Sequence, residues 1–151
     1  GFVTAARELS EHLGDAAMRA PEKLSEELHF LLRYAESRSA QDMARAKAIL
    51  QRTAAEIQAA MGDDGLLLMP TAPQAAFAHG IQPPANQAAF TGLANIAGLP
   101  AISVPAGLNN NALPIALQLV GPAGSEASLI AAARRLDMGL NGYAASPMMN
   151  S

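Results

Sequence analysis

Cysteine and tryptophan are absent from this sequence of 151 residues, and aromatic residues make up only 4% of it. Without cysteine there is no disulfide framework, no thiolate nucleophile and no cysteine-based zinc site. This composition is typical of a reducing compartment, so we expect a cytoplasmic protein. Half of the residues are hydrophobic, and small aliphatic side chains must therefore fill most of the core of a single domain.

A strongly basic surface is also missing, because the formal net charge is −3 and the pI is about 5.5. No run of lysine and arginine is interleaved with aromatic residues, so we expect no direct binding of nucleic acid. No apolar run approaches the roughly 20 residues that span a bilayer, and the first residues do not resemble a signal peptide, which argues against a membrane protein. Since the chain begins at Gly1 rather than methionine, the sequence leaves open whether a targeting segment lies upstream.

The first 62 residues carry helical signals. Pro21 suits the first position of a helix, and four residues then share one face of it: Leu24, Leu28, Leu31 and Ala35. Ser39 followed by Asp42 resembles a capping box with Asp in place of Glu, and predicts a helix over residues 40–61 that ends at Gly62.

Residues 63–138 predict a strand, helix, strand, strand and helix. GLLLMP at 65–70 indicates a strand buried on both faces, and a proline-rich loop over 71–85 follows it. Asn86 is the expected cap of a helix that stops at Gly98, and AISVP at 101–105 is the second strand.

Asn109 to Asn111 predict a turn in which asparagine tolerates positive φ, and a third strand over 113–120 follows it. Ser125 with Glu126 opens the last helix. In that helix Arg134 and Arg135 are expected near the C-terminal end, where cations are favourable. We expect the first two strands to be parallel, the third to be antiparallel, and residues 139–151 to form a tail.

The predicted fold class is therefore α/β, with a helical N-terminal segment and part of a mixed β-sheet flanked by helices, in one region over 1–151. Three strands that are apolar on both faces leave open edges, whose free N–H and C=O groups invite further strands. The sequence thus predicts a larger sheet than it can build.

Simple catalytic signatures are absent. The sequence has no GxSxG, SxxK or HExxH motif, no glycine-rich phosphate loop and no EF-hand spacing. His12, His29 and His79 are scattered, which favours surface or packing roles over metal ligation, and Asp63 with Asp64 favours a solvated turn over a catalytic pair. We therefore expect no catalytic residue, no metal site and no cofactor in this chain.

Three polar residues lie in apolar surroundings. Ser103 sits in a predicted strand with no nearby base, so a hydrogen-bonded strand serine is favoured over a nucleophile. For Asn95 and Gln118 a structural hydrogen bond is favoured over contact with a substrate.

Four segments together resemble the closing section of the amidase-signature family: DGLLLMPTAP at 64–73, FTGLANIAGLPAISVPAG at 90–107, LPIALQLVG at 113–121 and the following SEASLIAAARRLD. SRSAQDMARA at 37–46 is similar to the segment that precedes them in that family. The resemblance covers roughly residues 30–137 and implies a large mixed sheet wrapped by helices.

The resemblance also implies an activity. Family members hydrolyse amide bonds with a serine nucleophile, a second serine in a cis peptide and a lysine, all of which precede this section. Neither Lys23 nor Lys47 matches the family's lysine, so we expect the isolated chain to be inactive. Its implied partners are the N-terminal half of the amidase domain and a small amide substrate, with a homodimer possible.

In the family, the closing section supplies part of the wall of the acyl pocket. Thr71 and Phe90 are the candidates for that wall here, although structural roles for them in the core and in a turn are the stronger interpretation. The glutamine-recognising Asp of the tRNA-dependent amidotransferases that belong to the family falls where this sequence has Ala88, which disfavours the A subunit of glutamyl-tRNA amidotransferase. A third alternative is a truncated, non-catalytic interaction module.

Overall fold

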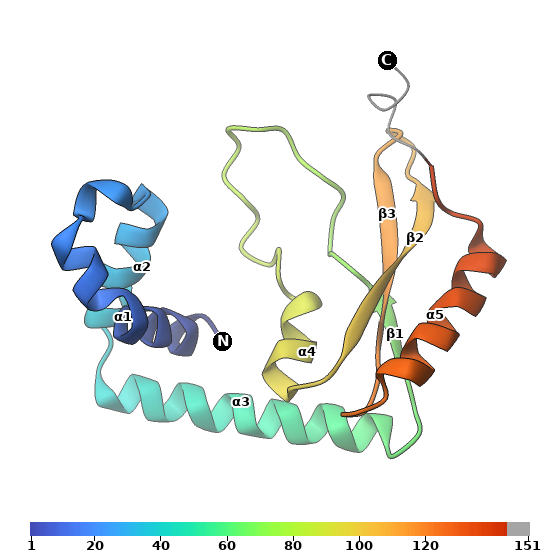
Figure 1. The fold of residues 1–151 in the computed structure, drawn as a ribbon, viewed down its shortest axis with the longest axis horizontal. Coiled ribbons are helices and arrows are strands. Elements are labelled where there is room, and N and C mark those ends of the chain that lie inside the picture. Colours follow the sequence, from blue (N-terminus) through green and yellow to red (C-terminus); the bar gives the residue numbers. More distant parts are fainter. Residues whose placement is uncertain (145–151) are drawn as a thin grey trace. The chain divides into compact units, whose positions relative to one another are not determined.

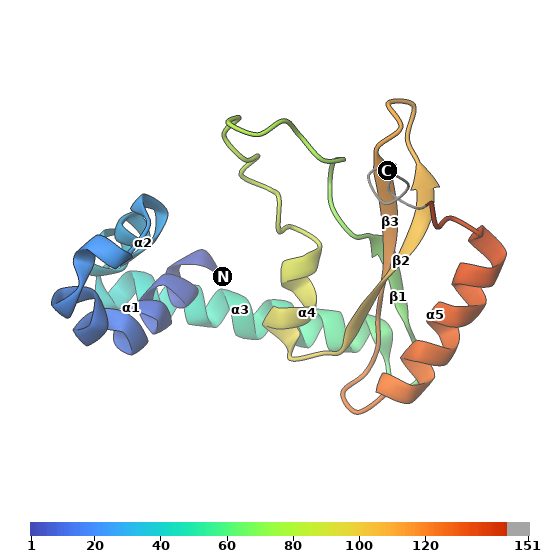
Figure 2. The same ribbon diagram turned by 45° about the horizontal axis from the view of Figure 1, so that its top comes forward.

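The computed structural model of the chain describes residues 1–144 and contains two compact units, Gly1–Thr53 and Ala54–Ser151. Figures 1 and 2 show the helices of the first unit, and the sheet of the second with α5 beside it. Among the described residues no helix is long and apolar enough to cross a membrane. The sequence predicts one region over residues 1–151, in which a helical segment ends at residue 62 and the sheet portion begins at residue 63. This organisation stays a prediction.

The first unit is built around a pair of helices, α1 (Phe2–Arg19) and α2 (Glu26–Glu36), which pack against each other. Ala6 of α1 and Ala35 of α2 are almost fully buried, because small side chains let helices approach closely. Between the helices, Pro21 begins a short 3-10 helix rather than the predicted α-helix. The α-helix begins only after Ser25, whose hydroxyl oxygen accepts a hydrogen bond from the Leu28 N–H at 3.4 Å.

Helix α3 (Ala40–Met61) has the bounds that the sequence predicts. Its capping box is confirmed: the Asp42 N–H donates to Ser39 Oγ at 3.1 Å, and the Ser39 N–H donates to Asp42 Oδ2 at 3.0 Å. Two of the backbone donors that a helix start leaves without partners are thereby satisfied. Gly62, with φ of +64°, ends the helix in the left-handed conformation that glycine adopts without strain.

The second unit contains a three-stranded sheet of β1 (Leu67–Pro70), β2 (Ala101–Leu108) and β3 (Pro114–Val120) in the order β1-β3-β2. Both pairings are antiparallel. The first two strands therefore run in the same direction, as predicted, but they are not neighbours, because β3 lies between them. An isolated parallel bridge joins Ala106 to Gly142 at the outer side of β2.

The expectation that β1 is buried on both faces is wrong for this chain. Leu68 is 55% exposed and Leu66 is 38% exposed, whereas Val120 on the central strand is 1% exposed. The reason is that β1 is an edge strand, and α5 (Glu126–Leu140) packs mainly on β2. The core between sheet and helix consists of buried residues from both: Val104, Leu119, Leu129 and Ala133.

Helix α5 extends further than predicted, to Leu140, with Asn141 in the left-handed conformation after it. Arg134 and Arg135 consequently lie in its middle, and no basic residue occupies its last turn. The tail predicted over 139–151 thus begins inside the helix, and residues 145–151 lie outside the described part of the chain.

The β2–β3 hairpin closes at the predicted asparagines, but the strained residue is a different one. The side chain of Asn109 accepts hydrogen bonds from the N–H groups of Asn111 and Leu113, at 2.9 and 3.0 Å. Positive φ, expected at an asparagine, falls instead on Ala112, at +57°. An alanine in this region is disfavoured by contact of its Cβ with the backbone.

Helix α4 (Thr91–Ala97) is shorter than predicted, because residues 85–90 form turns and Phe90 rather than Asn86 precedes the helix. Its predicted end is confirmed. Gly98 has φ of +65°, its N–H bonds to the Asn95 carbonyl, and the Leu99 N–H bonds to the Ala94 carbonyl at 3.0 Å. These two bonds form a Schellman motif, which turns the chain into β2.

Candidate functional site

The sheet face opposite α5 carries a row of side chains across all three strands. Gln118 of β3 lies opposite Met69 of β1 and opposite Ser103 of β2. Directly opposed residues of an antiparallel sheet point to the same face, so these three share a face. Val104 and Leu119 belong to the other face, since they pack against α5.

Thr71 and Ser103 meet on this face. Their hydroxyl oxygens are 2.7 Å apart, and either can donate the hydrogen bond. The Thr71 N–H donates to the Ala116 carbonyl at 3.0 Å, which continues the β1–β3 ladder one residue beyond Pro70. Thr71 is therefore held in place by its backbone and its side chain together.

Gln118 connects the sheet to the start of α4. Its side chain is only 4% exposed, and its Nε2 donates to the backbone carbonyl of Phe90 at 3.3 Å. A buried amide without a partner would be costly, so this bond accounts for a polar residue among apolar neighbours. It also fixes the residue from which the half-buried Phe90 side chain projects.

Asn95 does not join this group. Its Nδ2 donates to the Thr91 carbonyl at 3.1 Å, one turn back on the same exposed face of α4. We call the other groups the sheet-face cluster: Thr71, Ser103, Gln118 and the Phe90 carbonyl. The structure thus brings together Thr71, Phe90 and Gln118 of the four candidate residues.

The cluster offers hydroxyl and amide groups that can orient a ligand, but no acid or base. The partner of Ser103 Oγ is the Thr71 hydroxyl, which cannot take its proton at neutral pH, whereas an attacking serine needs an adjacent base. The groups of the cluster can therefore shape a pocket and position a ligand in it.

Ser103 is the member that sequence reasoning did not place in the site. It lies 32 residues from Thr71, and its neighbours in sequence carry no polar signal. Only the strand order could have revealed the contact, because β3 between β1 and β2 sets Thr71 and Ser103 on either side of Gln118 and Ala116.

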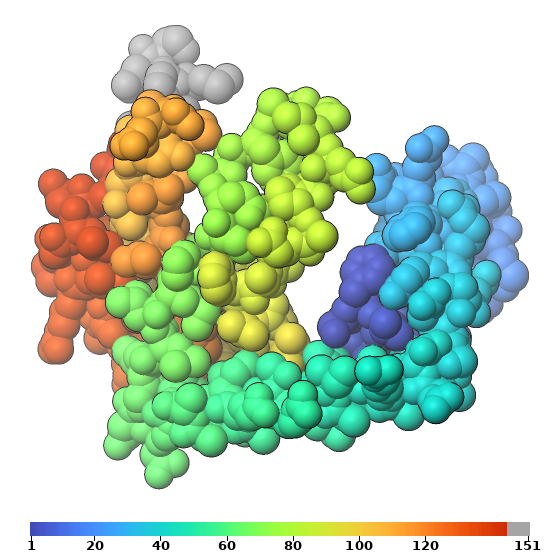
Figure 3. Space-filling view, turned by 180° about the vertical axis from the view of Figure 1, so that it is seen from behind, coloured from blue at the N-terminus to red at the C-terminus, as the bar shows by residue number. Residues whose placement is uncertain are grey.

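The segment from Thr71 to Phe90 borders the cluster. Within it Gln74 donates a hydrogen bond from Nε2 to Oε1 of Gln87, which braces the two ends of the loop. Phe77 and Ile81 remain 39% and 58% exposed, and the segment stands out from its unit in the space-filling view (Figure 3).

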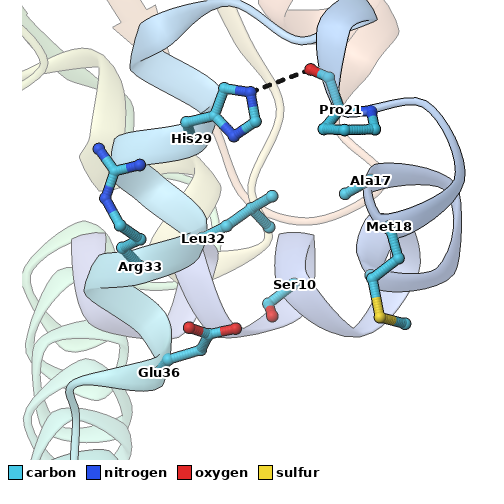
Figure 4. Close-up of a pocket in the computed structure, with 9 residues that line it drawn as sticks. Ser10, Ala17, Met18, Pro21, His29, Leu32, Arg33 and Glu36 are labelled. Atoms are coloured by element: carbon cyan, nitrogen blue, oxygen red, sulfur yellow. Dashed lines mark hydrogen bonds between the residues drawn. The ribbon is translucent and has the colours of Figure 1, made fainter.

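A separate cavity of about 320 Å³ lies between α1 and α2 in the first unit (Figure 4). Met18 and Leu32 line its apolar part, Glu36 projects from α2 toward Ser10, and Arg33 also contributes to the lining. The Nε2 of His29 is 3.0 Å from the Pro21 carbonyl, so this histidine is engaged with the backbone. No nucleophile with an adjacent base lines this cavity.

In the part of the chain that the structure describes, two carboxyl groups have clearly perturbed pKa values, and both serve helix starts. The Ser25 hydroxyl lowers the pKa of Glu27 by hydrogen bonding, and the Ser39 backbone N–H lowers the pKa of Asp42. Both side chains are fully exposed, and both shifts reflect hydrogen bonds made to the charged form. Within residues 1–144 no three His, Asp or Glu side chains group in a way that could hold a metal ion.

Comparison with known proteins places these features in context. The amidase family profile matches residues 5–130. The 2-amino-5-chloromuconic acid deaminase of Comamonas testosteroni is 35% identical over 134 residues, which cover 83% of this chain and 29% of that protein. The A subunit of the glutamyl-tRNA(Gln) amidotransferase from Parvibaculum lavamentivorans is 40% identical over 98 residues, or 62% of this chain and 20% of that protein.

Two solved structures share the fold. A structure described as an amidase superposes with a TM-score of 0.77 at 21% identity, over 89% of this chain and 33% of its own. The 6-aminohexanoate cyclic dimer hydrolase superposes with a TM-score of 0.70 at 22% identity, over 99% of this chain and 36% of its own. The chain therefore spans about a third of these structures and less than a third of the curated relatives named above.

Proposed function

The chain belongs to the amidase family, and from this premise we propose that it is the C-terminal part of an amidase that hydrolyses a carbon–nitrogen amide bond. The family match over residues 5–130 carries the proposal. The proposed chemistry uses a serine, a second serine in a cis peptide and a lysine, contributed by an N-terminal half outside these 151 residues. Its proposed location is the cytoplasm.

The part assigned to this chain is to shape the site. Gln118 holds the Phe90 carbonyl, and Ser103 holds the Thr71 hydroxyl, so both candidate pocket residues have fixed positions beside one sheet face. In the proposed reaction the serine oxygen attacks the amide carbon, the amine departs with a proton, and water releases the acid. Thr71 and Phe90 would then contact the acyl group, which must be held still during attack.

The A subunit of a glutamyl-tRNA(Gln) amidotransferase is the second candidate. Seven of the matched curated relatives are such subunits, including one from Ixodes scapularis that is 57% identical over 47 residues, or 31% of this chain and 9% of that protein. Ala88 argues against this candidate, because the position would hold the Asp that recognises glutamine. A non-catalytic interaction module is the remaining alternative.

One experiment separates the three candidates. The polypeptide translated from the reading frame that continues upstream of Gly1 would be purified and offered simple amides, and then glutamine with a mischarged glutamyl-tRNA and ATP, which activates the glutamyl carboxylate for attack by ammonia. Hydrolysis of simple amides without tRNA supports the amidase, and ammonia transfer to the tRNA supports the amidotransferase. Activity toward neither class, from a folded protein, leaves the interaction module.

A further inference from the structure

The middle of the chain carries no formal charge. Charged residues make up 15% of the sequence, yet none lies between Asp64 and Glu126. All three strands, α4 and every member of the sheet-face cluster belong to this stretch. His79 has the one ionisable side chain in it. A molecule that contacts the cluster therefore meets hydroxyl, amide and apolar groups of this chain.

Burial in an apolar core does not explain the missing charges. The loop between Thr71 and Phe90 contains several neutral polar side chains, and those of Gln82, Asn86 and Gln87 are exposed to solvent. Charged residues are tolerated at exposed positions as readily as amides. The stretch is thus polar without being charged, which suits a surface that binds a neutral group.

The charges that flank the stretch lie away from the cluster. Leu67 pairs with Val120 at one end of the sheet, where Asp64 precedes β1 and Glu126 follows β3. Thr71 follows the other end of β1, and at about 3.3 Å per residue the run from Leu67 to Thr71 alone spans roughly 13 Å. Exposed charges that are more than about 8 Å apart are largely screened at physiological ionic strength. Neither carboxylate is therefore near enough to pair with a charge at Thr71.

Helix α5 carries the next charges along the chain, at Arg134, Arg135 and Asp137. This helix packs on the sheet face that holds Val104 and Leu119, whereas the cluster lies on the opposite face. Figures 1 and 2 show α4 and α5 on opposite sides of the sheet. Arg134 and Asp137 line a groove between β2 and α5, which is on the α5 side. The sheet thus separates these charges from the cluster.

We propose that the acyl group of the amide substrate is uncharged and largely apolar, and that the sheet-face cluster selects it. The inference rests on the proposed function, in which Thr71 and Phe90 contact the acyl group. A carboxylate or an ammonium there would lose its water and find no opposite charge in this chain, which costs far more than burying an alkyl group. An alkyl chain would instead gain from contact with the half-buried Phe90 side chain. The hydroxyl pair of Thr71 and Ser103 can add a hydrogen bond to a neutral substituent.

Four amides of matched length test the inference: hexanamide, 6-hydroxyhexanamide, 6-aminohexanamide and adipic acid monoamide. They would be offered to the polypeptide extended upstream of Gly1. For the two charged amides kcat/KM is expected to be lower than for hexanamide by roughly 100-fold or more, because their charge is buried without a partner. The hydroxyl compound, which is polar but neutral, should stay within about tenfold of hexanamide. Turnover of either charged amide as fast as hexanamide would overturn the inference.

A matched pair of variants tests whether the cluster makes the selection. Ser103→Asp places a carboxylate in the cluster, and Ser103→Asn places a neutral side chain of the same size at this exposed position. The ratio of kcat/KM for 6-aminohexanamide to that for hexanamide should be at least about tenfold higher in Ser103→Asp than in Ser103→Asn. Asn110→Asp adds the same charge in the hairpin turn and should leave the ratio unchanged. Equal ratios in the two Ser103 variants would contradict selection by the cluster.

Binding is measured separately from hydrolysis. The extended polypeptide would be titrated with hexanamide or with adipic acid monoamide, while the amide chemical shifts of Thr71, Ser103 and the Gln118 side chain are followed. These shifts should saturate at a lower concentration of hexanamide. Saturation by hexanamide without hydrolysis of any amide would refute the proposed function alone. Hydrolysis with a preference for a charged amide would refute the inference alone, and the absence of both binding and hydrolysis would refute both.

Discussion

Replacing Gln118 with methionine should detach the start of α4 from the sheet. Methionine has a similar volume and no donor, so the change removes the bond from Nε2 to the Phe90 carbonyl and leaves little cavity. The bond is long at 3.3 Å, and Phe90 is half-buried, so water can solvate its carbonyl afterwards. We therefore expect a net loss of about 1 kcal/mol in the free energy of unfolding.

That loss is measurable in two ways. Urea unfolding followed by circular dichroism should show a lower midpoint with an unchanged slope, and the melting temperature should fall by roughly 4–8 °C for a unit of this size. The amides of α4 should exchange about fivefold faster, which is the same free energy expressed as a local opening.

Asn95→Ala is the matched control, because it removes an exposed side-chain bond within α4 itself and should cost less than about 0.5 kcal/mol. If the two variants destabilise the chain equally, or if α4 exchange is unchanged in Gln118→Met, then Gln118 does not anchor the helix.

Other changes test the helix start, the hairpin and the approach to β1. Ser39→Ala should destabilise α3 by about 1 kcal/mol, measured as lost ellipticity on urea titration, and Ser39→Thr should restore most of it. Because hydrogen bonds lower the pKa of Asp42, its contribution is present at neutral pH and is lost as the pH falls below about 4; a helix content constant from pH 7 to 2 would contradict this. Ala112→Gly should raise stability by about 1 kcal/mol by relieving a positive φ, and an unchanged melting temperature would show that the turn is unstrained. Gly65→Ala should cost about 2 kcal/mol or more, since the new Cβ would lie 2.0 Å from the Met61 carbonyl oxygen, and a neutral effect in urea unfolding would refute that packing.

Local signals in the sequence predicted the local structure well. The reciprocal bonds of Ser39 and Asp42, the bounds of α3 and the left-handed Gly98 all depend on residues within a few positions of one another. The sequence did not predict the positive φ at Ala112. The side chain of Asn109 accepts the hydrogen bonds that close the turn, and the residue with positive φ is therefore Ala112 rather than one of the asparagines.

Long-range structure was harder to predict. Hydrophobic pattern identified the three strands but not their order, since a strand that is apolar on both faces can pair with any other. The insertion of β3 between β1 and β2 brings Thr71 to Ser103 and leaves β1 at an edge, with Leu68 exposed. The family resemblance supplied the fold class, which the superposition on two solved structures confirms.

The proposed division of labour, in which an N-terminal part holds the attacking serine and this chain shapes the site, is tested most directly by a fluorophosphonate probe, which reacts with activated serines. The 151-residue chain should remain unlabelled, because its sheet serine is bonded to a threonine hydroxyl rather than to a base. The polypeptide extended upstream should be labelled on one serine outside residues 1–151. Stoichiometric labelling of any serine within the chain would contradict the account.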